Sequence, residues 1–254
     1  TAFFSALPAV ASHYAIPQPL ALDHGIRRYG FHGIAHRALW QRWCELRPEL
    51  PAGGRLLSIQ LGGGCSITAT REGAPQDTSM GFSPAEGLVM ATRCGDIDPA
   101  AIIHLLRHAG LSAEQLEQLI NTRSGLLGVS AGSADLQALF ADPDPQARLA
   151  AALYCYRLRK YIGAYLAVLG GADGIVFGGG VGEHVPEVRE RTLAGMHWCG
   201  IRLDARANHA ARGSEARISS SASDVDVRVL PVDEAAILAD EASRVLQDTQ
   251  EHSI

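Results

Sequence analysis

The sequence predicts an α/β domain in which helices flank a mixed sheet. Segments 56–61 and 65–70 are apolar and separated by glycines, so they predict two consecutive antiparallel strands. Helical and strand patterns then alternate along the rest of the chain, and glycine clusters stand where two of the strands end. A hairpin followed by alternating helices and strands is typical of α/β folds.

Each further element has its own signal. A helix is expected over 34–47, because the prolines at 48 and 51 end it. Segment 146–169 is long and apolar on one face, which predicts a core helix. Other helices are expected at 99–109, 112–120, 133–140, 186–195 and 233–246, and other strands at 174–177 and 225–230. The stretch 205–223 is rich in Ala, Arg and Ser and is expected to form a surface excursion.

Composition excludes several classes of protein. A formal net charge of −5 argues against nucleic acid or an anionic membrane as the main partner. The most apolar stretch, 161–182, is interrupted by Asp173 and by glycines, so no transmembrane helix is predicted. Lys160 is the only lysine and lies in a helical context, which excludes a P-loop and a protein-kinase site. The 5 cysteines lack a C-x-x-C pair, which favours a reducing cytoplasm over a zinc or disulfide framework.

Two glycine clusters are candidate phosphate sites. One, at 62–64, follows the strand expected at 56–61, and the other, at 178–182, follows the strand expected at 174–177. Glycine at a strand end lets backbone N–H groups approach phosphate oxygens without a Cβ in the way. Ordinary turns also use glycine, so each cluster has a structural alternative. The second cluster lacks the spacing and the strand–turn–helix order of a Rossmann fingerprint.

Polar residues concentrate at 77–99, where Arg93 stands among carboxylates and hydroxyls. A long loop inside a compact domain usually has a function, and Arg93 is suited to clamp a phosphate or a carboxylate. The alternative is a loop in which Asp98 only starts the next helix. His32 is interpreted either as a buried histidine bonded to the backbone, which local chemistry favours, or as a donor to a reacting anion.

A last polar pair stands at the junction between the expected strand at 225–230 and the expected helix at 233–246. Asp233 is suited to cap that helix, and Glu234 suits its first turn. The alternative for Glu234 is a Mg²⁺ ligand beside nucleotide phosphates.

Together these motifs resemble the acetokinase family, within the superfamily of actin, sugar kinases and chaperone ATPases. The matching stretches, in the family's order and spacing, are 27–33, 77–87, 92–99, 125–130, 175–183 and 233–234. The resemblance implies a ribonuclease H-like (actin-like ATPase) domain. The stretch 77–99 is specific to this family and argues against the alternative of a sugar kinase or a chaperone-type ATPase.

The resemblance implies reversible transfer of the γ-phosphoryl group of ATP to acetate, giving acetyl phosphate and ADP, with Mg²⁺ or Mn²⁺ as the metal. His32 matches the family histidine that contacts the phosphoryl group, and Arg93 matches the arginine that stabilises its charge. Phe31 and Pro84 match the pocket for the alkyl group, and Glu234 matches the metal ligand. The implied nucleotide-binding positions are Gln60, Leu61, Gly62, Gly63, Gly64, Asp135, Leu136, Gln137, Gly179, Gly180, Val181, Gly182 and Glu183.

Several residues depart from the family pattern, and three of them bear on the substrates. Gln60 and Gly63 replace the usual histidine and asparagine, which leaves the acid open between acetate and a butyrate- or propionate-type substrate. Gln137 replaces an arginine that commonly packs on adenine, which leaves the base preference open.

Family members carry a further N-terminal domain, and an aspartate precedes the position that matches Thr1. We therefore expect 1–50 to be a crossing helix and inter-domain segment, and 51–254 to be the C-terminal nucleotide-binding domain, with the N-terminal domain absent. The alternative is a catalytically incomplete fragment that binds nucleotide or dimerises. The resemblance also implies a cytoplasmic homodimer formed through this domain, with a short-chain carboxylate as substrate and with no nucleic acid or membrane partner.

Overall fold

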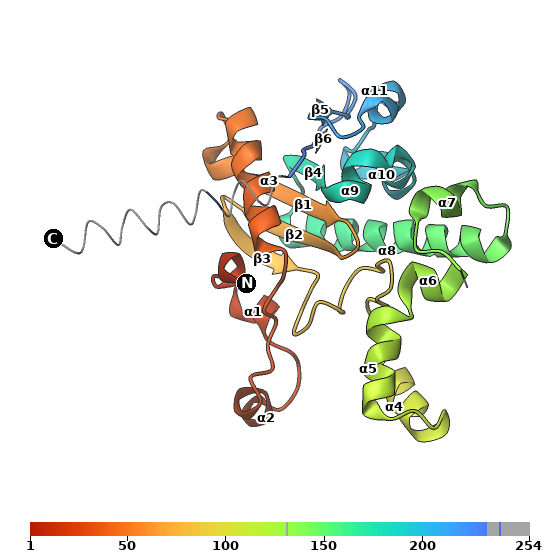
Figure 1. Ribbon diagram of the computed structural model, residues 1–254. Coiled ribbons are helices and arrows are strands. Elements are labelled where there is room, and N and C mark those ends of the chain that lie inside the picture. The colour runs from red at the N-terminus through yellow and green to blue at the C-terminus, as the bar shows by residue number, and fades with distance from the viewer. Residues whose placement is uncertain (131, 233–238, 240–254) are drawn as a thin grey trace.

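A mixed sheet forms the centre of the computed structural model, which describes residues 1–130, 132–232 and 239 (Figure 1). Within these residues the strand order is β3-β2-β1-β4-β6-β5. The strands are β1 (Arg55–Leu61), β2 (Cys65–Arg71), β3 (Ala74–Thr78), β4 (Gly174–Gly178), β5 (Ala216–Arg217) and β6 (Asp226–Val229). Strand β1 runs antiparallel to β2 and parallel to β4, and β4 runs parallel to β6. The predicted α/β class with a mixed sheet is confirmed.

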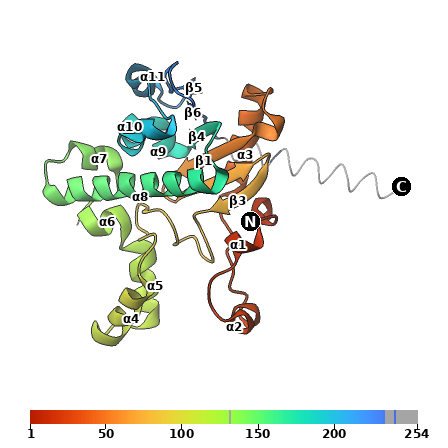
Figure 2. The ribbon, with the colours of Figure 1, turned by 180° about the vertical axis from the view of Figure 1, so that it is seen from behind.

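Helices cover both faces of the sheet, as Figures 1 and 2 show from opposite sides. Helix α3 (Gly33–Leu46) lies on one face and α8 (Pro145–Leu169) on the other. The remaining helices are α1 (Ala9–Ser12), α2 (Gln18–Asp23), α4 (Pro99–His108), α5 (Ala113–Thr122), α6 (Gly125–Ser130), α7 (Leu136–Ala141), α9 (Gly179–His184), α10 (Pro186–Leu193) and α11 (Ala205–Ala210). Short 3-10 turns are η1 (Ala2–Phe4), η2 (Pro51–Gly53) and η3 (Met196–Cys199).

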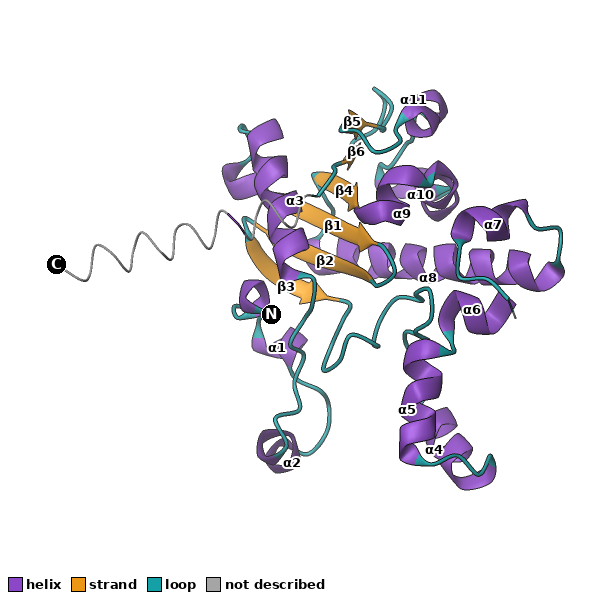
Figure 3. Cartoon of the chain, in the orientation of Figure 1, coloured by secondary structure: helices purple, strands orange, loops and turns teal. Residues whose placement is uncertain are grey.

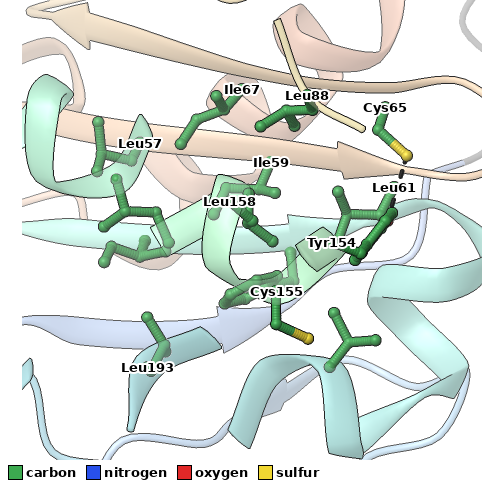
Figure 4. Close-up of a cluster of buried hydrophobic side chains, with 14 of the residues drawn as sticks. Leu57, Ile59, Leu61, Cys65, Ile67, Leu88, Tyr154, Cys155, Leu158 and Leu193 are labelled. Atoms are coloured by element: carbon green, nitrogen blue, oxygen red, sulfur yellow. Dashed lines mark hydrogen bonds between the residues drawn. The ribbon is translucent and has the colours of Figure 1, made fainter. Parts of the chain in front are cut away.

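The alternation of side chains along β1 explains the two layers, because successive residues of a strand point to opposite faces. Leu57 and Ile59 pack with residues of α8, among them Leu158 (Figure 4). Beside them the buried Tyr154 hydroxyl lies 3.2 Å from Cys65 Sγ, so the polar atom in this apolar layer has a partner.

The opposite face of β1 carries a smaller apolar cluster under α3. Leu56 packs there with Leu39 and Trp43 of α3. The Trp43 indole is fully buried and donates to Gly53 O at 2.8 Å. A Cβ on Gly174 would come within 2.3 Å of the indole ring, so glycine is required where β4 begins beneath α3. The boundary predicted at residue 50 stays a prediction, and α3 itself packs on the sheet.

Most expected elements appear within a residue or two of their predicted bounds, including α3, α4, α8, α10, β1, β2, β4 and β6. Several short elements were not expected, among them α2, α6, α9, β3 and β5. The expected surface excursion at 205–223 contains α11 and β5. The helix expected at 233–246 lies outside the described residues, apart from position 239.

A long loop joins β3 to α4 and has no regular secondary structure (Figure 3). It is nonetheless packed, because Met80, Leu88 and Met90 are buried in the main core. Beyond it, α4 and α5 project away from the sheet as an arm (Figure 1). Among the described residues, no helix has the length and apolar character that crossing a membrane would require.

Candidate active site

The two glycine clusters meet at one edge of the sheet. Strands β1 and β4 are parallel neighbours, and Gln60 pairs in register with Gly178. Because both strands run in the same direction, the turns that follow them leave the sheet side by side. Open α/β sheets bind ligands at the carboxyl ends of such strands.

The first glycine turn brings His32 and Arg93 together. Gly62 N donates to Gly64 O at 3.0 Å, which closes the turn between β1 and β2. A Cβ on Gly64 would lie 3.1 Å from Arg93 Nη1 and 3.2 Å from His32 Nε2. Two cationic or hydrogen-bonding groups from distant parts of the chain therefore face the same small space beside Gly64.

His32 occupies an unusual backbone position at the N-terminal end of α3. Its φ is 57° and its ψ is 28°, a left-handed conformation that costs a residue with a Cβ roughly 1–2 kcal/mol. The ring is half-buried, and its Nδ1 lies 2.9 Å from Ser66 Oγ. The imidazole therefore bonds to a side-chain hydroxyl through Nδ1, and Nε2 is the nitrogen that faces Gly64 and Arg93. The sequence favoured a histidine bonded to the backbone. The hydrogen bond of Nδ1 is instead to the Ser66 side chain.

Arg93 is held by the shape of its loop. Met90 N donates to Arg93 O at 3.1 Å, and Leu126 N donates to Met90 O at 2.9 Å. A Cβ on Gly125 would come within 2.3 Å of Met90 O, so α6 approaches the loop closely only because it begins with glycine. No carboxylate of the described residues forms an ion pair with Arg93, and its Nη1 donates to Met90 Sδ at 3.5 Å.

The second glycine turn opens a helix. Gly178 is extended, Gly179 has a φ of 77°, and α9 starts at once, so a short helix that the sequence did not predict precedes α10. The reason is local: the Glu183 carboxylate accepts from Gly179 N at 2.9 Å and satisfies the first turn of its own helix. Gly180 has open space where a Cβ would stand, and Val181 packs against the core.

A buried arginine supports this second turn from beneath. The Arg189 side chain has no exposed surface and donates to Gly182 O at 2.6 Å and Glu183 O at 3.1 Å, at the end of α9. It also donates to the carbonyls of Asn208 and Ala211, both at 2.7 Å, at the end of α11. One guanidinium thus caps the C-terminal ends of two helices, where carbonyls lack partners and a cation is favoured. Burial lowers the pKa of Arg189 to about 10, so the group remains charged at neutral pH.

The positions expected to contact adenosine lie at the start of α7. Asp135 caps the helix and accepts from Gln137 N at 2.8 Å. Leu136 is buried in the core. Gln137 is exposed and lines a cavity of about 400 Å³ with Phe140, Ala141, Glu187, Arg191 and Arg212.

The two residues expected to line the alkyl pocket stand on adjoining segments. Tyr29 N and Gly30 N both donate to Gly81 O, at 3.0 and 3.4 Å, which places the segment before Phe31 beside the segment before Pro84. Both side chains are half-buried.

An ionic cluster fixes this junction. Arg28 pairs with Glu86 at 2.7 Å, and Tyr14 also donates to the Glu86 carboxylate. Burial, followed by the bond to Glu86, raises the pKa of Tyr14 to about 12, so the phenol keeps its proton. Arg28 also donates to Thr78 O at 3.0 Å. The first 30 residues are therefore anchored to the loop that carries Pro84.

A side chain near the carboxyl end of β1 has an acceptor oxygen that suits a hydrated metal. Gln60 Oε1 is buried and has no hydrogen-bond partner among the described residues. Those residues contain no group of three His, Cys, Asp or Glu side chains that would form an all-protein cage. Mg²⁺ usually keeps several waters and takes one or two carboxylates plus phosphates, so the residues present fit this metal. Glu234, the expected ligand, lies outside the described residues.

Sequence reasoning missed the groups behind the site. His36, Ser58 and Ser66 are fully buried and bonded to one another behind His32, and Arg189 is buried beneath α9. A signal existed for His36, because it stands one helical turn after His32. No comparable signal marked Arg189, whose partners are backbone carbonyls.

Comparison with known proteins identifies relatives along nearly the whole chain. Residues 1–240 match the model of the Acetokinase family. Acetate kinases from Solibacter usitatus and Phocaeicola vulgatus are 43% and 45% identical, each over 97% of this chain and over 60% and 62% of the relative. The crystal structure of Porphyromonas gingivalis acetate kinase matches with a TM-score of 0.94 at 41% identity, over 97% of this chain and 62% of that one. A propionate kinase from Francisella tularensis matches with a TM-score of 0.88 at 32% identity, over 94% and 62%.

The sheet order, the helices on both faces and these structural matches define an actin-like ATPase domain, as predicted. Within that class, the chain belongs to the Acetokinase family. It spans about three-fifths of the length of the curated relatives that it matches.

Proposed function

We propose that the chain supplies the nucleotide-binding side of an acetate kinase active site. The reaction is the reversible transfer of the γ-phosphoryl group of ATP to acetate, giving acetyl phosphate and ADP. The observation that carries the proposal is the convergence of His32 Nε2 and Arg93 Nη1 beside Gly64, at the strand ends where both glycine turns leave the sheet.

This phosphoryl transfer needs stabilisation of the negative charge on the transferring group more than it needs proton transfer. An acetate oxygen forms a bond to the γ-phosphorus, the bond to the β–γ bridging oxygen breaks, and ADP leaves with that electron pair. Acetate is already ionised at neutral pH, so no base is needed to activate it. Arg93 offsets the negative charge on the transferring group, and His32 donates a hydrogen bond to it from Nε2.

The two turns and the cavity beside α7 bind different parts of the nucleotide in this proposal. We assign the phosphates to the turns at 62–64 and 179–183, and the adenosine to the cavity lined by Gln137. Mg²⁺, when bound, neutralises charge on the β- and γ-phosphates. Glu234 and the Gln60 amide oxygen are the groups we assign to hold it, the latter through water.

The hydroxamate assay for acetyl phosphate tests this function. The chain is assayed with ATP, Mg²⁺ and acetate, alone and with the portion of a relative that the chain does not match, for example of Porphyromonas gingivalis acetate kinase, supplied as a separate chain. Calorimetry with ATP and Mg²⁺ is run in parallel. We expect ATP binding in both cases, and acetyl phosphate at least in the complemented sample. Absence of ATP binding would refute the nucleotide assignment.

The second candidate is a catalytically incomplete fragment that binds nucleotide. It is favoured by one observation, the coverage of only about three-fifths of the relatives' length. Half a cleft cannot exclude water from the transferring group. ATP binding without activity in the uncomplemented chain, with activity restored by complementation, would assign the chain to this class.

The acid preference follows from the same assay. Acetate, propionate and butyrate are compared at equal concentration, because the relatives include both acetate and propionate kinases. Acetate is expected to give the highest kcat/KM, and preference for a longer acid would change the substrate and leave the reaction class intact.

We also propose that the protein is cytoplasmic and forms a homodimer. All five cysteines are free thiols, which suits a reducing compartment. Large apolar side chains are exposed on the arm and on α8, among them Ile103, Leu106 and Leu149, as expected of a surface that another chain covers. Light scattering should give twice the chain's 27.0 kDa mass.

Glu234 is tested by the metal requirement. Glu234→Ala should raise the Mg²⁺ concentration at half-maximal activity about tenfold, as expected from the loss of one carboxylate ligand. Glu190→Ala, an exposed carboxylate of α10, is the matched control. An unchanged Mg²⁺ titration would leave Glu234 as a residue of the helix start only.

A further inference from the structure

Four side chains form a hydrogen-bonded row behind the candidate active site. Ser58 Oγ lies 2.8 Å from His36 Nδ1, and His36 Nε2 lies 2.7 Å from Ser66 Oγ. Ser66 Oγ in turn lies 2.9 Å from Nδ1 of His32. The row crosses from β1 to α3, to β2 and back to the start of α3. Its last member is the histidine whose Nε2 faces Gly64 and Arg93.

Packing does not explain this row. Ser58, His36 and Ser66 have no exposed surface, and they stand beneath α3 next to a layer of leucine and tryptophan side chains. Buried polar groups are costly unless every donor and acceptor is satisfied. The members of the row satisfy one another's donors and acceptors. Counting those donors and acceptors therefore gives the position of each proton.

The count begins at His36. Burial, followed by repulsion from His32 when that ring is protonated, lowers the pKa of His36 to about 3, so the His36 imidazole is neutral at physiological pH. A neutral imidazole has one N–H donor and one acceptor nitrogen. One of its two serine neighbours must therefore donate to it, and the other must accept from it.

Ser58 decides the direction. His36 is the only partner of Ser58 Oγ among the described residues. If Ser58 accepted from Nδ1–H, its own proton would be buried without an acceptor, at a cost of about 1–3 kcal/mol. Ser58 therefore donates to His36 Nδ1, and His36 donates from Nε2 to Ser66. Ser66 then has one proton left, which it donates to Nδ1 of His32 in the neutral form of that imidazole.

We propose that Ser58, His36 and Ser66 are positioning residues that hold His32 in the Nε2–H tautomer. His32 then presents a hydrogen-bond donor, not a lone pair, to the space beside Gly64 and Arg93. The tautomer assignment stands on geometry alone. Its use, donation to the transferring phosphoryl group, rests on the proposed function. Because acetate needs no base, a fixed donor is the form of histidine that this reaction requires.

The first test needs no activity. The chain is labelled with ¹⁵N-histidine, and one- and two-bond ¹H–¹⁵N correlations are recorded at pH 8.5, with His32→Gln and His36→Gln used for assignment. We expect both His32 and His36 as Nε2–H tautomers with unprotonated, hydrogen-bonded Nδ1. An Nδ1–H tautomer at either residue would overturn the proposal.

Variants then test the direction of the row. Ser58→Ala removes the donor that orients His36, so an Nδ1–H population should appear at His36 and His32 together. Ser66→Ala should change the Nδ1 shift of His32 without that coupling. Thr70→Val is the matched control, because Thr70 is a buried hydroxyl residue of the same strand and face as Ser66, bonded to Leu56 O. Thr70→Val should leave both histidines as they are.

Kinetics separate positioning from a structural role. In the complemented enzyme, Ser66→Ala should lower kcat about tenfold with KM for ATP within about twofold, since one supporting hydrogen bond is lost. Ser66→Thr, which keeps the hydroxyl, should recover most of kcat. A shifted tautomer with unchanged kcat would overturn the positioning role. If no variant and no wild-type sample has activity, the proposed function fails and the tautomer result still stands or falls by the spectra.

Discussion

The two glycine turns rest on buried polar groups of opposite kinds. Behind the first turn lies the row of Ser58, His36, Ser66 and His32, which is neutral at His36 and whose hydrogen bonds set the positions of its protons. Beneath the second lies Arg189, a fixed charge bonded to main-chain carbonyls and to the Asn208 side chain. No carboxylate of the described residues pairs with it.

The difference between a neutral hydrogen-bonded row and a buried charge indicates a different role for each turn. A row of hydroxyls and imidazoles determines where a proton stands, and so which atom His32 offers to a ligand. A guanidinium surrounded by carbonyls determines where a backbone stands, because it ties the ends of α9 and α11 together. In the proposed function, the first region therefore serves the reacting group, and the second serves the shape of the nucleotide loop.

Removing the fixed charge should have the largest effect. Arg189→Met should lower the free energy of unfolding by about 4–5 kcal/mol, because four main-chain carbonyls and the Asn208 amide oxygen lose a buried donor. Urea denaturation measures the loss. Arg191→Met is the matched control on the same helix, where the exposed guanidinium lies 4.4 Å from the Phe140 ring. That control should cost less than about 1 kcal/mol. Equal losses in the two variants would contradict the role assigned to Arg189.

The charge at the first turn should matter for rate and little for stability. Arg93→Ala should slow acetyl phosphate formation about 10³-fold, equivalent to about 4 kcal/mol of transition-state stabilisation. Its unfolding free energy should stay within about 1 kcal/mol of wild type, since the side chain is not part of a buried network. Arg107→Ala, on the exposed arm, is the control. A rate change below about tenfold would remove Arg93 from the mechanism.

The neutral His36 should make stability depend on pH. The pKa of His36 is about 3 in the folded chain and about 6.5 when unfolded, so acidification protonates the unfolded state first. Stability is then complete above about pH 6.5 and is lost as the pH falls toward 3, at about 1.4 kcal/mol per pH unit. Urea midpoints of wild type and His36→Gln, measured between pH 7 and 4, isolate this contribution. Parallel curves would show that His36 does not resist protonation. Arg189 should add no slope in this range, because its pKa, lowered to about 10, lies far above it.

The sequence predicted the parts of the fold that repeat a local pattern. The hairpin of β1 and β2, the long helix α8 and the paired glycine clusters were all visible as runs of residue types. His32, Arg93 and the glycines were placed by resemblance, and the structure brings the side chains of His32 and Arg93 to the same turn.

The missing parts depend on contacts between distant segments. Ser58 and Ser66 look like ordinary strand residues, and only the register of β1 with β2 sets both beneath α3 beside His36. Arg189 was unrecognisable because carbonyls, its partners, are present at every position of any sequence. Helix α9 was missed because its first residues are glycines, and a carboxylate, Glu183, satisfies its start from within.

The smallest expected effect is a difference in unfolding free energy between single glycine substitutions in the two turns. Gly179→Ala should lower the unfolding free energy by about 2 kcal/mol or more, because a left-handed φ is strained and overpacking adds to it. The new Cβ would stand 2.5 Å from Leu61 O, a backbone atom that cannot move aside. Gly64→Ala should cost less than about 1 kcal/mol, since its neighbours are the ends of the Arg93 and His32 side chains, which can shift. Urea denaturation of the pair measures both. Equal costs would mean that the first turn is as rigid as the second, and that movable side chains do not distinguish the two regions.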